Sequence, residues 1–318
     1  MKAAVIDGYG GVDGFEIREV EKPSPGPGQL LVRVRAASVN PVDWKLRKGQ
    51  LRLVKPARFP LILGYDVAGE VEAVGAEVTR FEPGDPVYAL VDSAHGGGYA
   101  EFVLAGEEAV APKPERLSFE EAAAVPVAAL TALQALRDKA ELAQSERLLV
   151  NGAAGGVGHF AVQIGKAIGA RVIGVASGRN QEFLRELGAD RGIDYEEEDF
   201  TSDEEDYHVV FDTVGKASFK ECDLILEEGG VYVTTAIDPA IFIRSAISGI
   251  SSLFGPARRA RAIIVKPSGQ DLGLLGRLVD AGKLRPHVEE VFRLDRIADA
   301  HSYSESGRVR GKLVVRVE

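Results

Sequence analysis

The sequence has little cysteine and no long apolar run. Its 318 residues include one cysteine, Cys222, which excludes an intramolecular disulfide and a cysteine-rich zinc site and suits a reducing compartment. No stretch reaches the roughly 18 apolar residues of a membrane span, and the nearest, residues 236–254, is interrupted by Asp238, Pro239 and Arg244. Residues 1–7 lack the apolar segment of a signal peptide, so we expect a cytoplasmic protein.

Basic residues are fewer than acidic ones. The chain holds 38 Lys and Arg against 48 Asp and Glu, which gives a formal net charge of -10. An acidic protein repels phosphate backbones, so we expect no nucleic acid partner. The acidic excess is partly local, in residues 196–206, where we expect a solvated loop.

A glycine-rich turn at residues 151–158 is the most informative motif. It lies between an apolar strand-like run, residues 147–150, and a segment with helical apolar spacing that Gly169 is placed to end. In that context a glycine turn holds a pyrophosphate, because its backbone comes close to the ligand and the helix N-terminus attracts the anion. The match to G-x-G-x-x-G is partial, and we assign five turn residues to cofactor binding: Ala153 in the first glycine's place, Gly155, Gly156, Val157 and Gly158. The alternative is an ordinary glycine-rich turn, which the apolar run at 171–177 disfavours.

The rest of the chain predicts two structural regions. Residues 1 to about 110 suggest short strands at 3–6, 29–36, 67–75 and 86–90 without helices between them, as in a small barrel or sandwich. An S-x-x-E pattern at 118–121 predicts a helix start, and from residue 147 strands and helices alternate as in a doubly wound α/β domain. Strands at 288–294 and 311–317 around a helix at 296–304 suggest that the tail returns to the first region.

Several motifs now fit one family. They are Ser-Val-Asn-Pro-Val-Asp at 38–43, Leu-Gly-Tyr-Asp-Val-Ala-Gly at 63–69, Pro-Gly-Asp-Pro-Val-Tyr at 83–88, Gly-Tyr-Ala-Glu at 98–101 and the glycine turn. Together they resemble the medium-chain dehydrogenase/reductase superfamily, and within it the zinc-independent quinone oxidoreductase branch. The resemblance implies an α/β protein with a GroES-like β-rich catalytic domain, residues 1–121 completed by 266–318, and a Rossmann-type doubly wound parallel sheet domain, residues 122–265, that binds NADP. It also implies hydride transfer in the cleft between the two domains.

The resemblance bears on metal binding. Zinc-dependent members carry a cysteine in the place of Asn40 and Gly-His-Glu in the place of Gly64, Tyr65 and Asp66. A catalytic zinc needs three ligands of the Cys, His, Asp or Glu type, so we predict no metal. The histidines show no ligand spacing, and we expect each on the surface or in a loop: His95, His159, His208, His287 and His301.

The segment after the next predicted strand indicates the cofactor. NAD-preferring sites place an acidic residue about 20 residues after the glycine turn, but here Ser177 and Arg179 precede the first acid, Glu182. Arg179 suits a 2′-phosphate, with Ser177 and Asn180 adding hydrogen bonds, so we predict NADPH; a solvated arginine at a helix start is the alternative. The resemblance adds four further residues near the cofactor: Thr131, Tyr195, Val214 and Lys312.

We therefore expect an enzyme that reduces quinones or α,β-unsaturated carbonyls with NADPH. Candidate hydrogen-bond or proton donors are Tyr65, Asn40 and Lys45, although Tyr65 could instead only wall the pocket and Lys45 could be a surface ion-pair partner. A zinc-type alcohol dehydrogenase is disfavoured by the missing ligands. A third alternative is a cofactor-binding structural or peripheral membrane protein. It would bind the membrane through the apolar residues 237–254 and the basic residues after them, although we expect that stretch to shape the substrate pocket.

The apolar strand expected at 260–265 would be a sheet edge, and relatives dimerise there, so we predict a homodimer.

Overall fold

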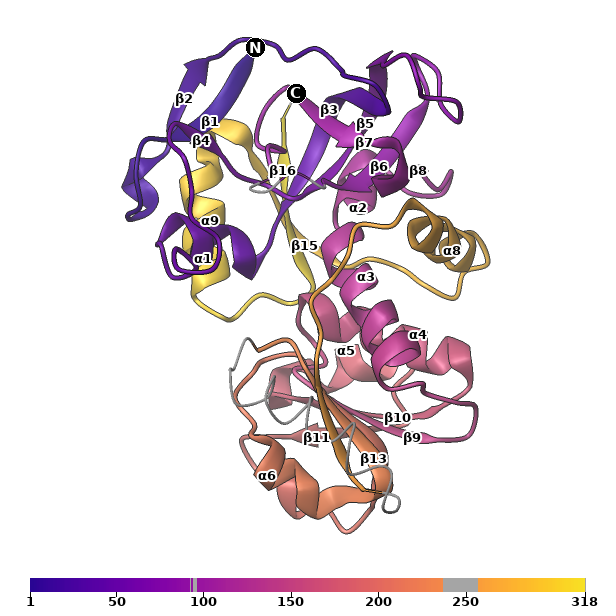
Figure 1. The fold of residues 1–318 in the computed structure, drawn as a ribbon. Helices are drawn as coiled ribbons and strands as arrows, with labels where there is room; N and C mark the ends of the chain where they lie inside the picture. Colours follow the sequence, from indigo (N-terminus) through magenta and orange to yellow (C-terminus); the bar gives the residue numbers. More distant parts are fainter. Residues whose placement is uncertain (92, 94–95, 237–256, 318) are drawn as a thin grey trace. The chain divides into compact units, whose positions relative to one another are not determined.

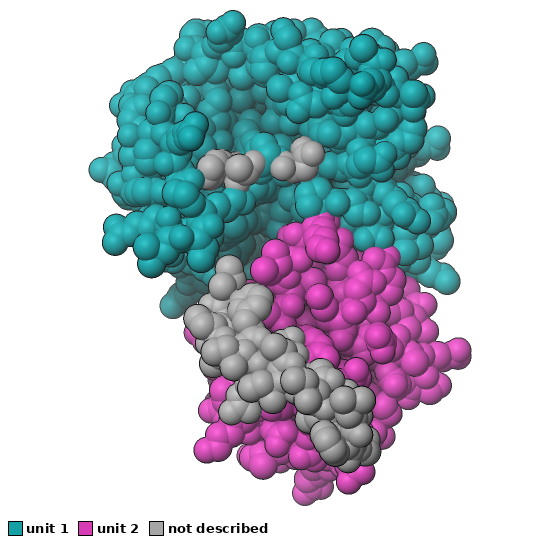
Figure 2. Space-filling model, viewed as in Figure 1, with its two compact units in different colours: residues 1–130, 267–318 teal, residues 131–266 magenta. Residues whose placement is uncertain are grey.

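A computed structural model describes residues 1–91, 93, 96–236 and 257–317. The chain divides into two compact units, residues 1–130 with 267–318 and residues 131–266 (Figures 1 and 2). Unit 1 is β-rich and contains both ends of the chain, whereas unit 2 is a parallel α/β domain. The fold class predicted from the sequence is confirmed. The predicted domain boundaries, at residues 121/122 and 265/266, stay a prediction.

Unit 1 is built on a seven-stranded sheet and a three-stranded sheet. The larger sheet has the order β15-β16-β3-β5-β6-β8, with β7 also paired to β3, and the smaller has the order β2-β1-β4. The strands of the N-terminal region are β1 (Lys2–Ile6), β2 (Glu16–Glu19), β3 (Gln29–Val39), β4 (Leu61–Ile62), β5 (Asp66–Val74), β6 (Pro86–Leu90), β7 (Phe102–Gly106) and β8 (Val110–Pro112). The helices of unit 1 are α1 (Pro41–Arg47), α2 (Phe119–Ala123), α8 (Gly269–Asp280), α9 (Ile297–Glu305) and the start of α3 (Pro126–Gln134).

The period-two pattern of β3 explains its place in the larger sheet. Val32 and Val34 are fully buried in the core, while Arg33 and Arg35 point to the other face. The two arginines donate to carboxylates of the antiparallel neighbour β5, with Arg33 Nη2 2.6 Å from a Glu72 oxygen. One face of the strand pair is therefore apolar and the other is paired by charge.

The C-terminal tail completes the larger sheet. β15 (Val288–Arg293) runs parallel to β16 (Lys312–Arg316), and β16 pairs antiparallel with β3. Leu313 lies opposite Val39 in this register, so Lys312 lies at the end of β3, next to α1. The predicted return of the chain to the first region is thus confirmed.

Unit 2 contains one six-stranded parallel sheet. Its strands are β9 (Arg147–Asn151), β10 (Arg171–Ala176), β11 (Arg191–Asp194), β12 (Tyr207–Asp212), β13 (Leu226–Thr234) and β14 (Arg259–Ala262). The strand order is β11-β10-β9-β12-β13-β14, which is the 3-2-1-4-5-6 order of dinucleotide-binding folds. The order reverses between β9 and β12, and ligands of such sheets bind beyond the carboxyl ends of the strands at that point.

Helices lie between consecutive strands in the described part of unit 2 (Figure 1). They are α4 (Gly156–Ile168), α5 (Gln181–Glu186) and α6 (Phe219–Cys222). Helix α4 packs on β9 and β10, α5 packs on β11, and α6 packs on β13. α4 ends at Gly169, whose φ of 96° is the left-handed conformation of a helix C-cap. Cys222 is a free thiol buried in the core of this unit.

Two histidine predictions are wrong. His159 and His301 are fully buried, whereas we expected both on the surface or in loops. His159 lies on α4 with Nδ1 3.0 Å from the Gly155 carbonyl oxygen, and His301 lies on α9, where its ring packs edge-on against Phe15. In both helices the histidine falls on the face that packs inward, which residue spacing for metal ligation does not reveal. His95 lies outside the described residues.

Candidate active site

The glycine turn follows β9 at the point where the strand order reverses. Gly155 is the N-cap of α4, and the backbone N–H groups of Gly152 and Ala153 both donate to the Val175 carbonyl at the end of β10. The turn is therefore fixed between two strand ends, with the first turn of a 13-residue helix behind it. This geometry leaves helix N–H groups for an anion at the carboxyl edge of the sheet.

Two glycines of this turn are sterically required. A Cβ at Gly158 would lie 2.1 Å from the Gly152 carbonyl oxygen, so no larger residue fits between α4 and the turn. Gly152 has φ +78°, and a Cβ there would lie 2.4 Å from Val214 Cγ2. A Cβ at Gly155 would meet the Gly152 oxygen at 3.3 Å, a tight contact but a less severe one than at Gly158 or Gly152. We expect glycine here because a pyrophosphate would come close to this backbone, and that role stays a prediction.

The end of β10 carries the residues predicted for the 2′-phosphate. Ser177 and Asn180 are buried, and Asn180 Nδ2 donates to Ser177 Oγ at 3.1 Å. Arg179 lies between them in the one-turn helix Gly178–Asn180 and is exposed. The three residues thus lie together at this turn, and binding of a phosphate by Arg179 stays a prediction.

The strand register places further candidates at the same edge. Asp194 at the end of β11 is opposite Ala176, and Asp212 at the end of β12 is opposite Asn151. Tyr195 and Val214 follow these strand ends and are 58% and 48% exposed. Both are large side chains left open to solvent at the carboxyl edge, as contacts to a bound nucleotide would require.

The four remaining cofactor candidates have different surroundings. Gly156 and Val157 form the first turn of α4, as predicted for residues that face a pyrophosphate. Thr131 is buried within α3. Lys312 is buried in unit 1 among protein groups, so the structure gives it internal partners; contact with a cofactor stays a prediction for both Thr131 and Lys312.

Lys312 belongs to a buried polar network with Asn40 and Asp66. Its ammonium donates to the Asn40 side-chain oxygen and to the Val39 carbonyl, and it lies 3.5 Å from Asp66 Oδ2. The Asn40 amide nitrogen donates to the same Asp66 oxygen at 2.8 Å, as does Ser38 Oγ at 2.6 Å. Both ends of the Asn40 side chain are therefore engaged inside the protein.

Asp66 also ties this network to a helix. Its second oxygen, Oδ1, accepts the Val127 backbone N–H at 2.7 Å, in the first turn of α3. A carboxylate is favoured there because the N-terminal N–H groups of a helix carry partial positive charge. Burial lowers the pKa of Lys312, and the Asp66 and Asp43 carboxylates oppose that shift.

Asp43 is a second buried carboxylate beside this network. It closes a capping box with Asn40 at the start of α1, and its Oδ1 accepts the Gly64 N–H at 3.2 Å. Burial raises its pKa to about 7, and the nearby Asp66 charge adds to that shift. The Tyr99 phenol, whose pKa burial also raises, hydrogen-bonds to Asp43.

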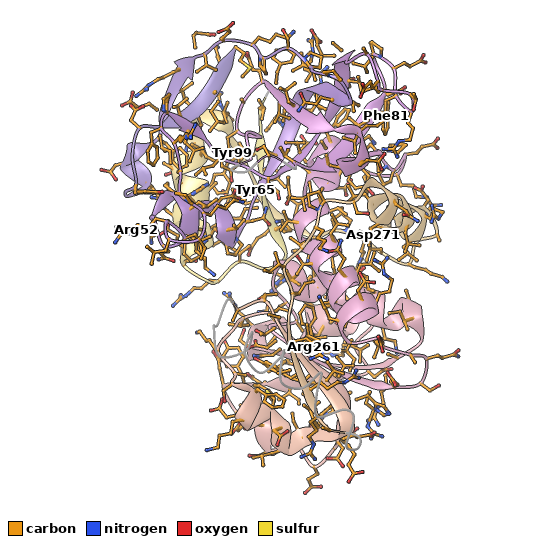
Figure 3. All side chains as sticks on the ribbon, in the orientation of Figure 1. Arg52, Tyr65, Phe81, Tyr99, Arg261 and Asp271 are labelled. Carbon is orange, nitrogen blue, oxygen red and sulfur yellow. The ribbon has the colours of Figure 1, made fainter. Side chains whose placement is uncertain are left out.

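Tyr65 lies directly before β5 and is 6% exposed (Figure 3). Its hydroxyl accepts a hydrogen bond of 2.6 Å from the Lys55 ammonium, which also lies 4.6 Å from the centre of the phenol ring. Burial raises the Tyr65 pKa well above its usual range, and the negative charge of Asp43 contributes. Sequence reasoning missed Lys55, because nothing in a loop sequence indicates that one of its basic residues folds back onto Tyr65.

Lys45, the third predicted donor, has a different position. It lies on the exposed side of α1, with its ammonium 5.6 Å from the centre of the Trp44 ring. No contact in the structure joins it to Tyr65 or Asn40 within the described residues. A chemical role for Lys45 stays a prediction.

Two features of the described residues bear on the remaining hypotheses. Among them, no group of three or more His, Cys, Asp or Glu side chains is arranged to hold a metal ion. No helix in the described ranges is long and apolar enough to cross a membrane. The apolar stretch 237–254, on which the membrane hypothesis rests, lies outside the described residues, so the hypothesis stays open.

Known proteins are similar to this chain in sequence and in fold. The family models of the alcohol dehydrogenase GroES-like domain and of the zinc-binding dehydrogenase match residues 26–115 and 187–315. The chain is 34% identical over 325 residues to a chloroplast envelope quinone oxidoreductase homolog of Arabidopsis thaliana, covering 99% of this chain and 98% of that protein. It is also 34% identical to a chloroplastic NADPH-dependent alkenal/one oxidoreductase of the same plant, covering 99% and 79%. Among solved structures, a quinone oxidoreductase from Coxiella burnetii matches with a TM-score of 0.88 and 36% identity, over 100% of this chain and 99% of that one.

Proposed function

The chain belongs to the medium-chain dehydrogenase/reductase superfamily, in its quinone oxidoreductase-like branch, and from that premise we propose an NADPH-dependent, zinc-independent reductase. Its substrates are quinones or the C=C bond of α,β-unsaturated carbonyls. The names of the relatives, quinone oxidoreductase and alkenal/one oxidoreductase, support the oxidoreductase class. The finer assignments rest on residues of this chain.

The Lys312 network is the observation that carries the zinc-independent assignment. The ammonium of Lys312 bonds Asn40 and lies beside Asp66, two of the three positions that match zinc ligands in metal-dependent relatives. The Lys312 ammonium already occupies the Asn40 oxygen and, while protonated, repels a second cation at those side chains. The third position, Tyr65, is a phenol bonded to another ammonium. This donor set does not fit zinc, although one matching family model is described as a zinc-binding dehydrogenase.

The substrate class follows from this donor set. Hydrogen-bond donors such as the Tyr65 phenol stabilise a developing oxyanion less strongly than a metal ion does. Conjugated acceptors suit such donors, because the charge that hydride addition brings is spread over the enolate or the hydroquinone ring. A saturated ketone concentrates the charge on one oxygen, so we expect its reduction to be slow.

The nicotinamide cofactor is supported by the turn and the strand ends. NADPH, when bound, supplies the hydride. The Gly155 backbone and the first turn of α4 would hold its pyrophosphate, while Arg179, with Ser177 and Asn180 behind it, would hold the 2′-phosphate. No acidic side chain follows β10 directly, where an NAD-preferring site would carry one.

A steady-state screen tests the proposed function. Purified protein is assayed with NADPH and with NADH against a naphthoquinone, a short-chain enone, an alkenal and the matching saturated ketone. We expect turnover of the quinone or the enone with NADPH, at least about 10-fold faster than with the ketone. Absence of turnover on every quinone and enone would refute the proposal, and a faster ketone would refute the substrate class.

We further propose a homodimer paired through β14. In the described part of unit 2, β14 lies at an edge of the sheet, and Ile264 just beyond it is 60% exposed. β14 itself alternates arginine and alanine, and the exposed apolar residue at this edge is Ile264. An open sheet edge is normally covered, and a second copy of the chain would cover both the strand and Ile264. Light scattering should give about twice the chain mass of 34.0 kDa, and a strictly monomeric mass would refute this assembly.

A further inference from the structure

The loop after α1 contains one lysine that behaves differently from its neighbours. Leu53 and Val54 are 92% and 74% exposed, whereas Lys55 is half-buried and bends back to the Tyr65 hydroxyl. A backbone hydrogen bond of 2.7 Å from the Lys55 N–H to the Leu51 carbonyl fixes this turn. The ammonium is therefore placed by the local fold and is the nearest cation to the phenol oxygen that the structure records.

A buried phenol is a poor proton donor by itself. If Tyr65 gave its proton to a substrate, a phenolate would remain in a buried position near the negative charge of Asp43. Both the burial and the charge disfavour that anion. A donor that replaces the phenol proton during the same step removes this obstacle.

We propose that Lys55 is the proton source for enone reduction, acting through Tyr65. The inference rests on the proposed function. A hydride from NADPH forms the new C–H bond at Cβ, and the C=C electron pair moves toward the carbonyl oxygen to give an enolate. Tyr65 transfers its hydroxyl proton to that enolate and takes one proton from the Lys55 ammonium, so the phenol stays neutral and Lys55 becomes an amine. Tautomerisation of the enol gives the saturated carbonyl.

The surroundings of Lys55 allow it to release and regain a proton. Burial lowers the pKa of its ammonium, which makes the neutral amine accessible, and the attraction of Asp43 limits that shift. The groups that act on this ammonium are thus Tyr65 in front of β5 and Asp43 on α1. Because Lys55 is only half-buried, water can return the proton between turnovers.

Two substitutions separate proton supply from charge and packing. Lys55→Met keeps an unbranched side chain of similar length and removes the ammonium proton. Lys55→Arg keeps a permanent positive charge that does not titrate. Lys22→Met is the matched control, since Lys22 also pairs with an acceptor and lies 3.8 Å from the centre of an aromatic ring, Phe102. Thermal unfolding of each variant establishes that it is folded.

We expect both Lys55 variants to lower kcat for an enone about 10- to 100-fold, with the control near wild type. Quinone reduction should change less than about 3-fold, because the hydroquinone anion is stable enough to take its proton from water. Wild-type kcat for the enone should fall as pH rises through a pKa below that of an ordinary lysine, and Lys55→Arg should lack this decline.

The outcomes separate the two proposals. If wild-type protein reduces neither quinone nor enone, the proposed function itself fails. If wild-type protein reduces the enone and Lys55→Met or Lys55→Arg does so equally well, the proposed function stands and the proton supply by Lys55 is refuted. An equal loss with quinone and enone would assign Lys55 to the shape of the site and would also refute it.

Discussion

Asp43 allows a direct test of how the buried network of unit 1 is charged. Its carboxylate is fully buried and accepts backbone hydrogen bonds from Asn40 and Gly64, and burial raises its pKa from 3.8 to about 7. The folded protein therefore binds more protons at this residue than the unfolded chain between those two pH values. The stability that protonated Asp43 contributes is complete below the unfolded pKa and is lost as pH rises through the folded one. From pH 5 to pH 8 this loss amounts to about 2–3 kcal/mol, since each pKa unit corresponds to about 1.4 kcal/mol.

The variant Asp43→Asn removes this titration. Whatever constant effect the substitution has, its free energy of unfolding should gain about 2–3 kcal/mol relative to wild type between pH 5 and pH 8. Other titrating groups, such as the buried His301 with its pKa lowered to about 3, are present in both proteins and cancel in this difference. Urea unfolding followed by tryptophan fluorescence reports unit 1 alone, because the single tryptophan, Trp44, adjoins Asp43.

Asp85→Asn is the matched control for this experiment. Asp85 also accepts a backbone N–H three residues earlier in the chain, from Glu82 at 2.9 Å, but at an exposed turn. Its substitution should change stability equally at both pH values. A difference between Asp43→Asn and wild type that stays constant from pH 5 to pH 8, or that moves against the variant, would refute the assignment of a protonatable buried Asp43.

Four further predictions concern the cofactor turn, the cofactor, the proposed proton donor and the metal. Gly158→Ala should destabilise unit 2 by about 1–3 kcal/mol, because its Cβ meets a carbonyl oxygen, whereas Gly155→Ala should keep the wild-type Tm and still weaken NADPH binding in calorimetry. Arg179→Ala should weaken NADPH binding about 10- to 100-fold by loss of a charge-assisted hydrogen bond and leave NADH nearly unchanged; equal losses for both cofactors would contradict the phosphate assignment. Tyr65→Phe should lower kcat for an enone by a factor on the order of 10 to 1,000, and unchanged kinetics would leave Tyr65 as a shape residue. Elemental analysis should find far less than one zinc per chain, and stoichiometric zinc removed by chelation together with activity would contradict the Lys312 argument.

The sequence predicts unit 2 well because its signals are local. Strand, glycine turn and helix follow one another directly at residues 147–168, and Gly169 ends the helix as expected. In unit 1 the longer strands β3 and β5 are also readable from alternation. The two-residue β4 and the short α1 are not, since pairing with distant strands and the capping box between Asn40 and Asp43 decide them.

The contacts of the candidate site depend on pairing over long distances along the chain. Lys312 reaches Asn40, 272 residues away, only because β16 pairs with β3. The sequence suggested that the tail returns to the first region but not which strand end it meets. The Lys55–Tyr65 pair depends in the same way on the path of a loop, and no periodicity encodes that path.

The most direct test of the proposed reaction follows the hydride itself. The protein is incubated with NADPH deuterated at C4 of the nicotinamide and with a short-chain enone, and the product is examined by NMR. We expect a saturated ketone that carries deuterium at Cβ and a proton from water at Cα. Deuterium on the carbonyl carbon of an allylic alcohol, or none in any product, would contradict the assignment of this chain as an NADPH-dependent enone reductase.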